Sequence, residues 1–144
     1  MKKNFYRLIY VSDNEIEGTN EFIQHEIKQI LEVSRLKNKE AGITGALMFN
    51  KGCFAQVLEG PQNSIQTTFE RIQCDTRHSN VVILNYEVIE KRRYENWSMA
   101  YVGDNESIAQ EFFEIKEKSN FDPESLAGEK IYQLLKEHLI SEEK

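Results

Sequence analysis

The residues that could carry chemistry in this sequence are polar side chains at positions where apolar ones are expected. Gln56 lies between Phe54 and Leu58 in a predicted strand, and alternate side chains of a strand share one face. Its amide is therefore placed between two large apolar groups. A buried amide without hydrogen-bond partners costs on the order of 1–3 kcal/mol. Either the protein or a bound ligand must supply those partners.

Two further polar residues face the same predicted interior. Tyr10 shares a strand face with Leu8, so its ring is expected to be buried and its hydroxyl to need a partner. On a predicted helix, the apolar stripe that includes Ile30 continues to Ser34 and Asn38, each four residues further on. Taken alone, Tyr10 is more typical of ordinary core packing. Asn38 could equally end the helix and bond its last carbonyls.

The combination of these groups narrows the chemistry. A phenol and two amides, from Tyr10, Asn38 and Gln56, form neither a metal-ligand set nor a nucleophile with its base. They suit a planar ligand with alternating donors and acceptors along one edge, held in a mostly apolar pocket. We predict no metal site. Trp97 and Met99 share one face of a later predicted strand, where core packing is the simpler interpretation.

The elements that must position these residues alternate along the chain. We predict strands at residues 5–12, 43–49, 53–58, 81–90 and 97–102, and helices at residues 20–38 and 64–74, the second capped by Asn63. Each helix has a single apolar stripe, so both should pack on one face of the sheet. This order predicts an α+β fold, a ferredoxin-like βαββαββ sandwich. Residues 104–144 are expected to form a C-terminal helical extension of a domain spanning residues 1–103.

Composition limits the class of protein further. The chain has 144 residues, 40% of them hydrophobic, and a net charge of −6, which argues against direct nucleic-acid binding. Cys53 and Cys74 are too few for a disulfide framework and fit a reducing compartment. Neither a signal peptide nor a membrane-spanning stretch is predicted, so we expect a cytoplasmic protein with no membrane contact.

Several segments, in order and with ordinary spacing, resemble one known family. They are Tyr10 on the first strand, Ser34-Arg-Leu-Lys-Asn38, Gly42-Ile-Thr-Gly-Ala-Leu, Phe54-Ala-Gln56-Val-Leu-Glu-Gly60, Ile72-Gln-Cys-Asp75-Thr-Arg77-His78-Ser-Asn-Val and Arg92-Arg-Tyr-Glu-Asn-Trp97-Ser-Met99. Together they resemble the BLUF domains, which are blue-light sensors that use FAD. The similarity extends from about residue 5 to residue 103 and does not cover the tail.

The resemblance implies a cofactor and the residues that hold it. FAD would bind non-covalently, with its isoalloxazine ring between the two helices. The implied cofactor-binding residues are Tyr10, Ile30, Ser34, Asn38, Phe54, Gln56, Ile72, Asp75, Arg77 and His78, the last three at the ribityl and phosphate end. The implied photochemical residues are Tyr10, Gln56, Trp97 and Met99.

The resemblance also implies a signalling function without catalysis. Light would drive an electron and a proton from Tyr10 to the flavin, after which Gln56 would change its hydrogen bonds. Beyond the resemblance, we hypothesise that the last strand passes the change to the tail helices and so to a separate effector or regulator protein, and we expect a homo-oligomer. Two alternatives are a flavin-free regulatory module of the same fold and an acylphosphatase-like hydrolase. The acidic residues 12–15 count against a hydrolase, which would need an arginine-bearing phosphate loop there.

Overall fold

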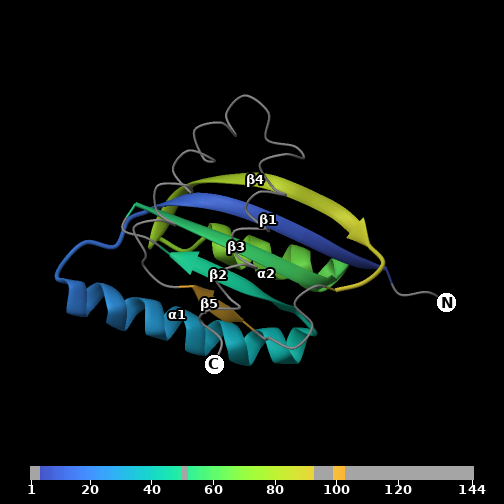
Figure 1. The fold of residues 1–144 in the computed structure, drawn as a ribbon, viewed down its shortest axis with the longest axis horizontal. Helices are drawn as coiled ribbons and strands as arrows, with labels where there is room; N and C mark the ends of the chain where they lie inside the picture. Colours follow the sequence, from blue (N-terminus) through green and yellow to red (C-terminus); the bar gives the residue numbers. More distant parts are fainter. Residues whose placement is uncertain (1–3, 50–51, 93–98, 103–144) are drawn as a thin grey trace.

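The computed structural model describes residues 4–49, 52–92 and 99–102. Its elements are β1 (Phe5–Asn14), α1 (Asn20–Ala41), β2 (Thr44–Phe49), β3 (Cys53–Pro61), α2 (Gln62–Gln73), β4 (His78–Ile89) and β5 (Ala100–Val102) (Figure 1). This order is the one that the sequence predicts. Three predictions fall outside the described residues: the domain boundary at residue 103, the helices expected within residues 104–144, and the role of Trp97.

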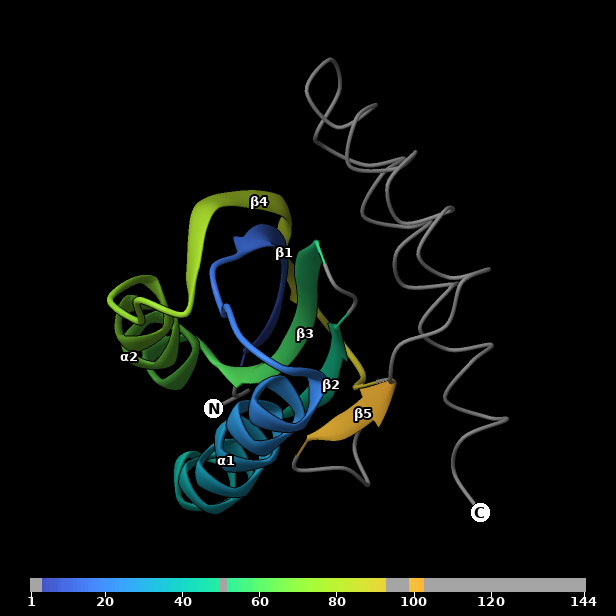
Figure 2. The same cartoon turned by 90° about the vertical axis from the view of Figure 1, so that its left-hand side faces the viewer.

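The strands form one sheet in the order β4-β1-β3-β2-β5. The first four strands pair antiparallel, and β5 pairs parallel to β2. Both helices lie on the same side of the sheet (Figure 2). Buried residues of α1 and α2, such as Ile27 and Ile65, join one core cluster with alternate residues of the inner strands, such as Leu8 and Leu58. The prediction of a ferredoxin-like sandwich with both helices on one face is confirmed.

Two predicted helix ends are wrong. The helix predicted to end at Asn38 continues to Ala41, and Gly42 ends it in the left-handed conformation, with φ of 73°. The backbone N–H of Gly42 donates to the carbonyls of Asn38 and Lys39. Asn38 is therefore an interior residue of α1, and the alternative in which it ends the helix does not hold.

The start of α2 also differs from the prediction. The helix begins directly after Pro61, whose φ of −62° suits the position before a helix, and no side chain caps it. Asn63 lies within the helix and is not its cap. Strand β3 runs to Pro61, so strand and helix join without the loop that the predicted cap would need.

Strand β4 begins at His78, three residues before its predicted start. Its register against β1 shifts twice, and Asn80 has a φ of 52°, so the start of the strand is irregular. Local side-chain alternation does not reveal a strand that contains such irregularities. The early start places His78 next to the end of α2, where its side chain faces the space between the helices and the sheet.

No helix within the described part of the chain combines the length and apolar character that crossing a membrane requires.

Gly45 provides a test of how closely β2 and β3 approach. A Cβ added at Gly45 would lie 1.9 Å from the carbonyl oxygen of Val57 on β3. We expect Gly45→Ala to lower the free energy of unfolding by roughly 3 kcal/mol, because the paired strands would have to move apart. Urea unfolding of the purified protein measures this change.

Gly42→Ala is the matched control. Its added Cβ would come no closer than 3.9 Å to another residue, at Pro61, so the cost comes only from the left-handed backbone. That cost is about 1–2 kcal/mol. Equal destabilisation by Gly45→Ala and Gly42→Ala would contradict the close approach of the two strands.

Candidate functional site

A cavity of about 560 Å³ lies between the two helices and the sheet. This volume is within the range of pockets that hold small-molecule ligands and cofactors. Its lining includes all ten residues predicted to bind a cofactor: Tyr10, Ile30, Ser34, Asn38, Phe54, Gln56, Ile72, Asp75, Arg77 and His78. The structure thus brings the predicted set together in one place. That these residues hold a cofactor remains a prediction.

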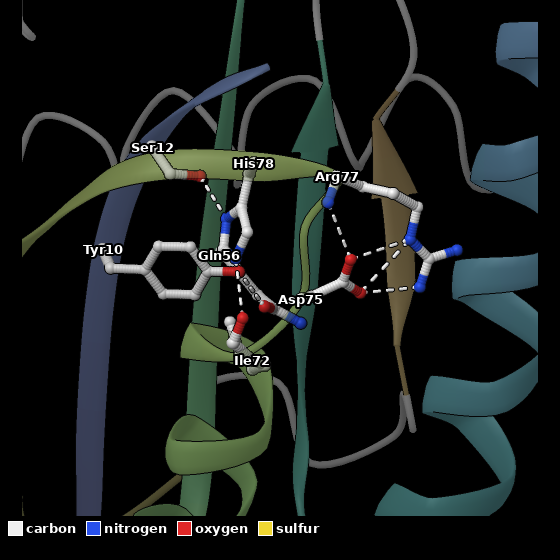
Figure 3. A network of polar contacts seen from close by, with 7 residues as sticks. All are labelled: Tyr10, Ser12, Gln56, Ile72, Asp75, Arg77 and His78. Carbon is white, nitrogen blue, oxygen red and sulfur yellow. Dashed lines mark hydrogen bonds and ion pairs between the residues drawn. The ribbon is translucent and has the colours of Figure 1, made fainter. Parts of the chain in front are cut away.

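Tyr10 and Gln56 meet at the sheet wall of the cavity because the register of β1 and β3 pairs them directly. The hydroxyl of Tyr10 donates to Oε1 of Gln56 at 2.6 Å (Figure 3). The two residues are 3% and 4% exposed, so the bond forms in a site with little water. This contact answers part of the hydrogen-bonding requirement that the sequence poses at Gln56.

The amide of Gln56 has a second, weaker contact. Its Nε2 donates to the thioether Sδ of Met99 at 3.5 Å. A primary amide can donate two hydrogen bonds and accept two, and a thioether is a weak acceptor. The side-chain bonds seen among the described residues therefore use only part of the capacity of Gln56. The remainder is available to a ligand in the cavity that this residue lines.

The phenol of Tyr10 is held in its protonated form. Burial raises the pKa of Tyr10 well above its ordinary value, and the nearby charge of Asp75 raises this pKa further. The ring packs against Phe69 and His78, with centroid distances of 5.7 and 6.1 Å. At neutral pH Tyr10 is therefore a hydrogen-bond donor whose proton points at Gln56.

One edge of the cavity carries a charged pair that follows α2. Arg77 contacts the carboxylate of Asp75 through Nε and Nη2, with a shortest distance of 2.6 Å (Figure 3). The side-chain hydrogen bond from Arg77 lowers the pKa of Asp75, although partial burial opposes this shift. Both side chains are about one-third exposed, so the pair lies at the mouth of the cavity.

His78 links three elements beside this pair. Its Nε2 lies 2.7 Å from the carbonyl oxygen of Ile72, and its Nδ1 lies 2.7 Å from Oγ of Ser12 (Figure 3). A carbonyl can only accept, so Nε2 carries the proton. The imidazole thereby fixes the end of α2 against β1 and β4. Ile72, which lines the cavity, is held in place by this bond.

The two helices contribute opposing walls. Ile30 of α1 and Ile72 of α2 are half-buried and line the cavity from either side. Asn38, buried on α1, lines it one turn beyond Ser34. The site thus combines apolar walls with a phenol and two amides. This donor set suits a planar heteroaromatic ring such as a flavin.

Some lining residues were not predicted: Gln29, Glu32, Val33, Lys37, Leu47, Thr68 and Arg71. Two of them carried a usable signal. Thr68 lies four residues before Ile72 on the same helix face, and Leu47 precedes the hairpin that pairs it with Gln56. The others belong to largely exposed stretches of the helices, where the hydrophobic pattern does not distinguish a cavity edge from solvent.

Met99 does not line the cavity, although its side chain is 2% exposed and contacts Gln56. In residues 4–49, 52–92 and 99–102, no three His, Cys, Asp or Glu side chains are grouped so that they could hold a metal ion.

Comparison with known proteins identifies a family. The model of the family described as BLUF, sensors of blue light using FAD, matches residues 5–100. The photoactivated adenylate cyclase subunit beta of Euglena longa is 32% identical over 96 residues, which are 67% of this chain and 11% of that protein. The blue light- and temperature-regulated antirepressor BluF of Escherichia coli (strain K12) is 32% identical over 69 residues, 48% of this chain and 17% of that protein. The chain therefore spans only about a tenth to a sixth of these curated relatives.

Solved structures match over nearly the whole length. The photo-activated state of BlsA is 33% identical, with a TM-score of 0.73, over 94% of this chain and 95% of that one. The dark-state structure of BlrB, a BLUF protein, is 26% identical, with a TM-score of 0.76, over 98% of this chain and 99% of that one.

The raised pKa of Tyr10 predicts its behaviour at high pH. A phenol whose pKa is higher in the folded state contributes to stability below the unfolded pKa of about 10 and loses that contribution as pH rises above it. We therefore expect Tyr10 to remain protonated in the folded protein when exposed tyrosines ionise. Ultraviolet titration of tyrosinate in the wild type and in Tyr10→Phe should give coincident curves until alkaline unfolding begins. A difference curve with one tyrosine ionising near pH 10 in the folded protein would contradict this expectation.

Proposed function

The chain belongs to the BLUF family of blue-light sensors that use FAD, and from this premise we propose that it binds FAD in the cavity and signals through Gln56. The observation that carries the proposal is the 2.6 Å hydrogen bond from Tyr10 to Gln56 at the wall of the cavity. It places a protonated phenol and a buried amide beside the space that a flavin ring would fill. When bound, the flavin supplies a light-absorbing group whose excited state is a stronger oxidant than its ground state.

The chain's own residues divide the work of binding. Ile30 and Ile72 would contact the two faces of the ring, and Asn38 and Ser34 would bond its pyrimidine edge. These roles fit the positions of the four residues on the helices that flank the cavity. Because the walls are apolar, water is displaced when the ring enters, which strengthens the remaining polar contacts.

Cationic side chains at the mouth of the cavity suit the phosphate groups of a flavin nucleotide. Lys37, Arg71 and Arg77 are cationic lining residues, and a diphosphate linker carries negative charge. Arg77 is engaged by Asp75, so a phosphate would compete for the same guanidinium. These cations therefore support a flavin that carries phosphate, and FAD is proposed over FMN because the description of the family names FAD.

Tyr10 and Gln56 form the switch. Tyr10 holds its proton on Oη, directed at Oε1 of Gln56. Tyr10 would give up an electron and this proton to the bound, light-excited flavin, with Gln56 on the path of the proton. Loss of that proton removes the donor that keeps Oε1 facing Tyr10. Rotation or tautomerisation of Gln56 would then become favourable, and either change would alter its bonds to Met99 and to the ligand. A hydrogen bond that stabilises the excited state more than the ground state shifts absorption to the red.

The remaining assignments complete the proposal. Residues 1–103 would form the photosensor, and residues 104–144 the extension through which it acts. The effector would be a separate protein and the sensor itself not an enzyme, with a homo-oligomer and a cytoplasmic location. One relative is named as a photoactivated adenylate cyclase and another as a blue light-regulated antirepressor, so the regulated activity differs within the family.

An absorption spectrum of the purified protein tests the cofactor and the photochemistry together. We expect a yellow protein whose flavin bands shift slightly to the red under blue light and return in darkness. Chromatography of the released flavin distinguishes FAD from FMN. A colourless protein that takes up no added flavin would favour the flavin-free regulatory module instead.

Gln56→Leu tests the switch. Leucine keeps the approximate size of the side chain on the cavity wall but removes both hydrogen-bonding groups, so the variant should bind flavin and lose the red shift. Gln66→Leu, an exposed glutamine of α2 outside the cavity lining, is the matched control and should keep the shift. A normal light-induced shift in Gln56→Leu would exclude the proposed mechanism.

A further inference from the structure

Arg35 joins α1 to the segment that enters β5. Its Nε donates to the backbone carbonyl of Met99 at 2.9 Å, across 64 residues of sequence. The pairing of β5 with β2 begins at Ala100 opposite Ala46, so the Met99 carbonyl lies just before the paired residues. A hydrogen bond from a charged donor is stronger than a neutral one. The guanidinium therefore anchors the backbone where β5 begins.

The residue that Arg35 anchors, Met99, contacts Gln56. The side chain of Met99 is 2% exposed, and its Sδ accepts from Nε2 of Gln56 at 3.5 Å. A methionine side chain has three rotatable bonds and adapts to its surroundings, so the position of its sulfur depends strongly on where its backbone is held. Arg35 supplies that hold from the same helix that lines the cavity through its neighbour Ser34.

We propose that Arg35 is a positioning residue that holds the Met99 backbone so that the Met99 sulfur faces Gln56, and that it thereby governs the return from the light-adapted to the dark state. This inference rests on the proposed function. When Gln56 changes its hydrogen bonds, its contact with the Met99 sulfur changes, and Met99 can shift only against the bond from Arg35. Return requires the sulfur to regain its dark position, which the anchor favours over alternatives.

The variant that tests this is Arg35→Ala. It should keep its flavin and the size of its red shift, because Arg35 does not line the cavity. Its return to the dark spectrum should slow on the order of fivefold, as expected for loss of one partly exposed, charge-assisted hydrogen bond. Lys28→Ala, which removes an exposed cation from the same helix, is the matched control and should return at the wild-type rate. Arg35→Lys, which keeps a charged donor, should restore the rate to within about twofold of the wild type.

A second background separates positioning from general stability. Met99→Leu removes the sulfur but keeps the backbone carbonyl that Arg35 binds. If Arg35 acts through the sulfur, adding Arg35→Ala to Met99→Leu should leave the return rate almost unchanged, since the two effects are not additive when one residue acts through the other. Equal slowing in both backgrounds would overturn the proposal.

Methyl NMR provides a readout that needs no illumination. The chain has three methionines, Met1, Met48 and Met99, so methionine labelled at its methyl carbon gives a simple spectrum, and Met99→Leu assigns one signal. In the dark, Arg35→Ala should shift the Met99 signal and leave that of Met48 in place. An unmoved Met99 signal, or an unchanged return rate with full flavin content, would refute the role of Arg35. A wild-type protein that lacks flavin or a red shift would instead refute the proposed function, and the methyl spectrum would still test the anchor.

Discussion

The buried hydrogen bond between Tyr10 and Gln56 is the interaction on which the site depends. Both side chains are almost completely shielded from water, so neither can exchange its partner for solvent. A buried donor or acceptor left without a partner costs about 1–3 kcal/mol, which is large beside the net stability of a domain. The orientation of the amide is therefore tied to the location of one proton. If Tyr10 loses that proton, Gln56 must therefore change its hydrogen-bond partners, because no water molecule can take the place of the phenol.

The fold maintains this bond through strand register. Tyr10 pairs with Gln56 across β1 and β3, and Leu47 pairs with the same residue across β2 and β3. Side chains alternate along a strand, so a one-residue slip of β3 would turn every one of its side chains to the opposite face, including Phe54 and Leu58 of the core. The neighbour on each side of β3 holds it against such a slip. The apolar core thus fixes the polar pair. The helices need only cover the same face and leave a cavity between them.

The sequence predicted what depends on local periodicity and missed what depends on distant contacts. Alternation placed Tyr10 and Gln56 on inward faces, and helical spacing placed Asn38 on the inner side of α1, all of which the structure bears out. The cap at Asn63 was wrong because β3 runs directly into α2, which no helix signal reveals. The bond from Arg35 to Met99 left no trace in the pattern. Arg35 lies on an exposed part of its helix, and its partner is a backbone carbonyl, which any residue type provides.

The strands are held in the sheet by unequal numbers of hydrogen bonds, and this difference indicates which strand moves when Gln56 changes its hydrogen bonds. Its two side-chain partners belong to different parts of the sheet, Tyr10 to β1 and Met99 to the segment that enters β5. Strand β1 is paired on both sides along nearly all its length, whereas β5, as far as the structure describes the chain, has three residues and pairs only with β2. Displacing β1 would break many ladder bonds together, but displacing the start of β5 breaks few. A rearranged amide should therefore move the edge of the sheet and leave its centre unchanged. If Arg35 acts as proposed, an anchor at that edge should therefore influence the hydrogen bonds of Gln56 more than a further bond within the centre.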